Sequence, residues 1–173
     1  MRRALPLLVA TAAACQASPS GPCPGVPVAT LQLVGTRQLV GCDAGAPASG
    51  FDATWPPELR FGATVSFGSQ GDGAALCLDR RGADPLVGAH QGDQVSVALD
   101  TSGATLEACA PGCAATVTQT VAGTLQRDAA TGAVNGFTGT LTDRASAAAG
   151  ASCGPCTLPC GATYLLAPAP AAP

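Results

Sequence analysis

Residues 116–142 read TVTQTVAGTLQRDAATGAVNGFTGTLT, and this stretch decides the predicted fold. Apolar residues and threonines alternate along two arms, which is the pattern of half-buried strands. Between the arms, Asp128 can accept hydrogen bonds from its own turn and Gly132 can adopt a positive φ. The stretch therefore predicts a β-hairpin. We expect one face to carry Val117, Val121, Leu125, Phe137 and Leu141, and the other to carry Thr116, Thr118, Thr120, Thr124, Thr138, Thr140 and Thr142.

The turn also predicts a register for this hairpin. Pairing Arg127 with Ala133 would place Phe137 opposite Gly123, where an aromatic ring covers backbone that glycine leaves bare. Asn135-Gly136 is a rival turn signal. A turn there would leave arms of unequal length, so we interpret it as a bulge.

The rest of the chain predicts more strands of the same kind. Short alternating runs are separated by turn signals about every ten residues, and no stretch keeps a period of 3.6. Gly35 is expected to end the first strand, and residues 101–103 are expected to form a turn. The prediction is an all-β antiparallel sandwich or barrel of about seven to nine short strands, with periodicity unable to choose between them. The strands are expected at residues 28–34, 37–42, 59–67, 74–79, 94–100, 104–109 and 163–166, and residues 85–89 are expected to form a short strand at best.

The N-terminus has the pattern of an export signal. Arg2 and Arg3 precede an apolar run over residues 4–14 that is too short to span a bilayer as a helix. The run ends in Ala12-Ala13-Ala14-Cys15. We therefore predict a signal peptide over residues 1–14.

The residues around Cys15 resemble the lipobox of bacterial lipoproteins, in which small residues precede a cysteine that is lipidated. Ala12 stands where the commonest pattern has Leu, and ordinary signal-peptidase cleavage after the alanines is the alternative. The resemblance implies a protein anchored to the cell envelope by an N-terminal lipid. Gln16 is not the Asp that retains enteric lipoproteins in the inner membrane, so the outer membrane is favoured.

Composition divides the remaining chain. Residues 15–27 are rich in Pro, Gly and Ser and predict a tether. Residues 28–166 predict one all-β domain, and residues 167–173 a disordered Pro/Ala tail. Leu, Val and Phe make up only 33 of the 173 residues while the net charge is −3, which indicates a small core that needs support. The chain lacks Lys and its Arg residues are scattered, which argues against a nucleic-acid surface.

Disulfides are the expected support. The chain has nine cysteines, and lipidation of Cys15 would leave eight, an even number that can pair in an oxidising compartment. We expect Cys23 to bond Cys42, because both flank the first strand region. The disulfide candidates are Cys23, Cys42, Cys77, Cys109, Cys113, Cys153, Cys156 and Cys160.

Cys153-Gly154-Pro155-Cys156 resembles the active-site motif of the thioredoxin family, which implies thiol–disulfide oxidoreductase activity. The surrounding sequence lacks the strand and helix that the family places around it, so a stapled loop is favoured. Zinc is the other alternative, because two short cysteine pairs suit a tetrahedral site. That site would use Cys109, Cys113, Cys153 and Cys156.

The remaining polar candidates favour plain structural roles. His90 is placed in a surface loop, and no nearby nucleophile suggests a catalytic pair. Five turn aspartates match no calcium-loop spacing and are interpreted as caps of their own turns. A threonine face is similar to the ice-binding face of several antifreeze proteins, but half-exposed strands favour Thr anyway. The aspartates are Asp72, Asp79, Asp84, Asp93 and Asp100.

Together these patterns predict a cell-envelope lipoprotein whose β scaffold has a binding or structural role and no catalytic one. Its partners would be the membrane, through the lipid, and an envelope protein or small ligand. No cofactor, metal or nucleic acid is expected. The alternative is a thiol–disulfide oxidoreductase that uses Cys153 and Cys156.

Overall fold

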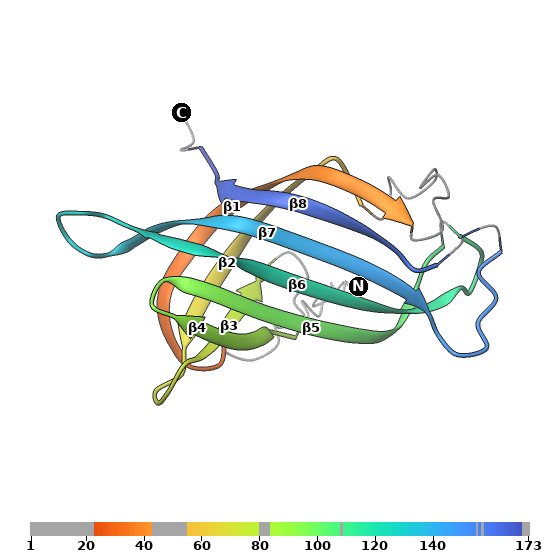
Figure 1. The fold of residues 1–173 in the computed structure, drawn as a ribbon, viewed down its shortest axis with the longest axis horizontal. Helices are drawn as coiled ribbons and strands as arrows, with labels where there is room; N and C mark the ends of the chain where they lie inside the picture. Colours follow the sequence, from red (N-terminus) through yellow and green to blue (C-terminus); the bar gives the residue numbers. More distant parts are fainter. Residues whose placement is uncertain are drawn as a thin grey trace, which may run out of the picture.

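The chain folds into a closed barrel of eight antiparallel strands (Figure 1). The structure is a computed structural model and describes residues 23–42, 55–79, 84–107, 109–154, 156 and 158–170. Each strand pairs with the next along the chain, and the last pairs with the first. The all-β prediction is confirmed, and the barrel is the right one of its two alternatives. The strands are β1 (Val26–Cys42), β2 (Glu58–Phe67), β3 (Gly73–Leu78), β4 (Leu86–Gln91), β5 (Gln94–Thr105), β6 (Ala114–Arg127), β7 (Val134–Ala147) and β8 (Cys160–Pro168).

The predicted hairpin is β6–β7, and its turn projects well beyond the neighbouring turns in Figure 1. The turn has the predicted mechanism. Asp128 Oδ1 accepts hydrogen bonds from the backbone N–H groups of Ala130 and Thr131 at 3.1 and 2.8 Å, and Gly132 has a φ of 70°. These contacts hold the two arms in an antiparallel pair.

The predicted register of this hairpin is wrong by two residues. Phe137 lies opposite Leu125, and Gly123 lies opposite Gly139. Arg127 pairs with Val134, and a register shift follows directly, at the position predicted to be a bulge. A slip of two residues leaves every side chain on its expected face.

The aromatic ring nevertheless covers the expected glycine. A Cβ atom built on Gly123 would lie 2.6 Å from Cζ of Phe137, so the ring lies over the bare backbone. The contact is diagonal across the hairpin, because Phe137 itself pairs with Leu125.

Two of the predicted strand breaks are absent. Gly35 does not end the first strand, because it pairs with Leu59 on one side and Leu166 on the other. Residues 101–103 are not a turn between strands: Gly103 has a φ of 75° at an irregularity inside β5, which continues to Thr105. In both places the barrel ladder holds the strand together where local sequence favoured a break.

Inward side chains from all eight strands form one buried cluster. Trp55, in the segment before β2, belongs to it with 2% of its surface exposed, and its carbonyl oxygen accepts a hydrogen bond from Nη1 of Arg37. Among the described residues, no helix has the length and hydropathy needed to cross a bilayer. The threonine face of β6–β7 lies on the outer wall, partly or fully exposed.

Candidate functional site

Two disulfides join the loop after β5 to the loop after β7. Cys109 bonds Cys156, and Cys113 bonds Cys153. Leu106 packs beneath these loops with 4% of its surface exposed, and its backbone N–H donates to the carbonyl of Cys113 at 2.9 Å. We call this end of the barrel the disulfide end, and the opposite end, which carries the β2–β3, β4–β5 and β6–β7 turns, the turn end.

The disulfide pattern differs from the one that the thiol–disulfide oxidoreductase alternative requires of Cys153 and Cys156. In a thioredoxin-type motif the two cysteines form a disulfide with each other. Here Cys153 and Cys156 belong to two different bridges, and Cys153 is buried. The motif is therefore two anchor points of one stapled loop.

The same bridges occupy the four sulfurs that the zinc alternative required as thiolates. Within the described part of the chain, no group of three or more His, Cys, Asp or Glu side chains is arranged to hold a metal ion.

The expected Cys23–Cys42 bridge is wrong. Cys23 bonds Cys77, which lies on the outer side of β3. Sequence proximity to the first strand favoured Cys42, but the segment before β1 folds back across β2, where Cys23 Sγ lies 3.6 Å from the carbonyl oxygen of Thr64. The N-terminal segment is therefore joined to the barrel wall.

Cys160 is also disulfide-bonded, and in β8 it lies opposite Cys42 of β1. The backbone of Cys42 is described, but its side chain lies outside the described part of the structure, as does all of Cys15. The lipidation prediction for Cys15 therefore remains a prediction.

The barrel interior contains a polar pair that the sequence reasoning missed. Gln119 and Asp143 lie opposite each other on β6 and β7, with 3% and 2% of their surfaces exposed. Gln119 Nε2 donates a hydrogen bond to Asp143 Oδ1 at 2.7 Å. The signal was present in the alternation, because both residues share the inward parity of Val121 and Leu141. A buried, paired carboxylate of this kind acts as a fixed polar contact within an apolar core.

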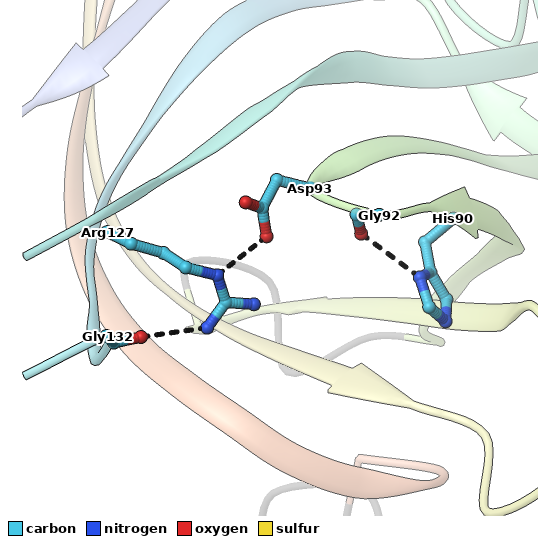
Figure 2. Close-up of polar contacts among 5 residues, drawn as sticks. All are labelled: His90, Gly92, Asp93, Arg127 and Gly132. Atoms are coloured by element: carbon cyan, nitrogen blue, oxygen red, sulfur yellow. Dashed lines mark hydrogen bonds and ion pairs between the residues drawn. The ribbon is translucent and has the colours of Figure 1, made fainter. Parts of the chain in front are cut away.

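At the turn end, Figure 2 shows a second set of polar contacts. Arg127 lies between two loops: its Nε contacts Asp93 Oδ1 at 2.8 Å, and its Nη1 donates to the carbonyl of Gly132 at 2.9 Å. The side chains of Arg127 and Asp93 are 41% and 39% exposed. This ion pair therefore links the β4–β5 turn to the β6–β7 turn but contributes little to the stability of the fold.

His90 lies in β4, so the prediction that it lies in a surface loop is wrong. Its ring stacks on Phe67 with 3.7 Å between centroids, and Nδ1 lies 3.2 Å from the carbonyl oxygen of Gly92 (Figure 2). The ring therefore closes part of the turn end as a packing group.

The other turn aspartates are spread over the barrel. Asp79 Oδ1 accepts from the backbone N–H of Gly62 at 2.7 Å, and Asp100 Oδ1 accepts from Thr118 Oγ1 at 2.6 Å. The Asp79 carboxylate thus accepts the backbone hydrogen bond that a further residue of β3 would otherwise accept from Gly62. Asp100 instead accepts from an outward threonine, so these two aspartates do not share a site.

A hollow of about 610 Å³ lies on the outer wall over Gly62. A Cβ atom on Gly62 would lie 2.2 Å from Asp79 Oδ2 and 3.0 Å from Gln32 Nε2, so the ends of these two side chains lie over bare glycine backbone. Arg60 and the C-terminal residues Ala169 and Pro170 complete its rim. An amide, a carboxylate and a guanidinium therefore meet around a bare patch of backbone, which makes this hollow the candidate contact site on the described outer wall.

Comparison with protein-family models, with curated proteins and with solved structures found no match for this chain.

Proposed function

We propose that the chain is a cell-envelope protein, held to the membrane by a lipid on Cys15, whose stapled barrel has a binding or structural role and no catalytic one. One observation carries the proposal. Every cysteine whose side chain the structure describes is in a disulfide, and such density of bridges belongs to oxidising compartments. These cysteines are Cys23, Cys77, Cys109, Cys113, Cys153, Cys156 and Cys160.

The anchor part of the proposal rests on the small residues before Cys15. Intact mass of protein purified from envelope tests it, and we expect an acylated N-terminus and no alkylation until a reductant is added. A Cys15→Ser variant should leave the membrane fraction and keep all its bridges, whereas the matched control Ser18→Ala should stay. Exposure of one free thiol in Cys15→Ser would mean that Cys15 is a bridge partner, and the anchor proposal would fail.

The outer-membrane assignment rests on Gln16. Density-gradient separation of the two membranes should place the wild-type chain in the outer membrane of an enteric host. A Gln16→Asp variant should move to the inner membrane of that host. Equal distribution of both proteins would contradict the assignment.

The binding role is assigned to the hollow over Gly62. A photo-crosslinking residue in place of Gln32, on its rim, should give a discrete adduct in intact cells. The same residue in place of Thr140, an exposed position on β7, is the control. Adducts at neither position would leave the barrel with a structural role, and adducts at Thr140 alone would move the contact site to the β7 wall.

A further inference from the structure

The Cys23–Cys77 bridge determines where the N-terminal segment leaves the barrel. It fixes Cys23 to the outer side of β3, next to Thr64 of β2, and not to the start of β1. Residues 24 and 25 then run along the wall to β1 at Val26. A Cβ atom on Gly25 would lie 2.6 Å from the carbonyl oxygen of Phe67, so this strap is pressed against β2.

The wall under the strap is uncharged. Outward residues of four neighbouring strands form one row across it: Pro27 pairs with Ser66, Ser66 with Ala75, and Ala75 with Val87. Ser66 and Ala75 are outward yet buried. We call this row, together with the strap, the β2–β4 flank.

Exposed apolar side chains lie on the flank itself. Val87 is 55% exposed, and Pro24 and Pro27 are exposed as well. A hollow lined by Pro24, Gly25 and Val87 lies between strap and wall. Three apolar or small residues thus surround the point at which the N-terminal segment is held.

If the anchor proposed above is correct, the length of the segment between Cys15 and Cys23 limits which wall of the barrel can face the membrane. Seven residues lie between Cys15 and Cys23, so a fully extended segment lets the two cysteines be at most about 28 Å apart. That is close to the diameter of a small domain. With a lipid on Cys15, the wall opposite β3 could therefore reach the membrane only if the tether were fully extended, whereas the wall around β3 reaches it with a relaxed tether.

We propose that the β2–β4 flank is the surface that the barrel presents to the lipid bilayer. Exposed aliphatic side chains beside a short acylated tether gain from shallow contact with the headgroup region, and an uncharged row adds no repulsion from anionic lipids. The exposed pair Leu39 and Leu165 lies on β1 and β8 and is directed elsewhere. This inference rests on the proposed lipid anchor.

Tryptophan quenching tests the orientation in the full-length, acylated protein. Val87→Trp places a probe on the flank, and Leu165→Trp places a matched probe on β8, four strands away in either direction around the barrel. Leu165 is 52% exposed, so both substitutions are at surface positions of similar exposure. The native Trp55 is buried and gives the same background in both. Each protein is reconstituted into vesicles of phosphatidylethanolamine and phosphatidylglycerol, with or without bromine on the acyl chains.

We expect brominated lipid to remove most of the added emission of Val87→Trp and little of that of Leu165→Trp. Equal quenching of both probes, or stronger quenching of Leu165→Trp, would overturn the inference. So would quenching of neither probe in protein that floats with the vesicles. The mass of each purified protein is recorded first. Absence of an acyl group on Cys15 would mean failure of the proposed anchor itself, which distinguishes that failure from a wrong orientation.

Discussion

Gln119 on β6 donates a 2.7 Å hydrogen bond to Asp143, its directly opposed residue on β7, inside the barrel. Removing the amide leaves a buried carboxylate oxygen without this donor. We expect Gln119→Ala to lower the free energy of unfolding by about 1–3 kcal/mol. Urea unfolding under non-reducing conditions measures the loss. Gln126→Ala, the same change at an exposed position of β6, should alter stability by at most about 0.5 kcal/mol. Equal losses would contradict the importance of the buried contact.

Phe137 is the aromatic residue that packs over Gly123, with 2% of its surface exposed. Phe137→Ala should destabilise the barrel by about 3–5 kcal/mol, because it removes a buried ring and leaves the glycine backbone uncovered. Thr140→Ala, on the outer wall of the same strand, should cost well under that. Thermal or urea unfolding of both variants decides the question, and similar losses would mean that the inner face is misassigned.

Cys160 is disulfide-bonded, and Cys15 and Cys42 are the two cysteines whose side chains lie outside the described part of the structure. The β1–β8 register places Cys42 opposite Cys160, so we expect these two to form the fourth bridge. Peptide mapping after digestion without reduction should recover a Cys42–Cys160 cross-linked fragment. A fragment joining Cys15 to Cys160 would contradict both this pairing and the lipid anchor.

Asp128 gives the barrel a pH dependence of known sign. Hydrogen bonds from the backbone of Thr131, then from its hydroxyl and from the backbone of Ala130, hold the pKa of Asp128 below its ordinary value of 3.8. A lowered folded-state pKa stabilises the fold above the unfolded pKa, and this contribution is lost as pH falls through the folded pKa.

The measurement is the melting temperature of wild type and Asp128→Asn over about pH 2 to 7. Wild type should be the more stable at neutral pH, and the difference should shrink toward the acid end. A difference that stays constant with pH would show that the charge of Asp128 contributes nothing.

The sequence carried most of the strand pattern, because alternation reports directly which side chains face inward. The turn at Asp128 and Gly132 could be predicted in detail, since its contacts are local. The register could not be predicted, because two one-residue differences add up. The turn is one residue longer than expected, and Asn135 is an extra residue in the second arm. Gly35 looked like a strand end only because its partners, on β2 and β8, are distant in sequence.

The candidate site was harder to predict than the fold. Cys77 became the partner of Cys23 because the N-terminal segment folds back across the barrel wall, and no local pattern indicates that path. The alternation already placed Gln119 and Asp143 at inward positions. A buried polar side chain needs a hydrogen-bond partner, however, and the pairing of β6 with β7 that supplies it could not be predicted in register. The hollow over Gly62 joins residues from β1, β2 and the C-terminal segment, which alternation within single strands cannot bring together.

The pairing of β1 with β8 sets the order in which the barrel can be completed. Every other strand finds its partner in the segment made just before it, so those pairings close small loops and form early. β1 precedes the other strands of the barrel in the sequence, and one of its edges stays open until β8 pairs with it. Until then that edge is a row of unpaired backbone groups, which other chains can join. A barrel in which β8 has not yet paired with β1 therefore offers an open edge to its own copies, and closure of the β1–β8 seam removes that edge.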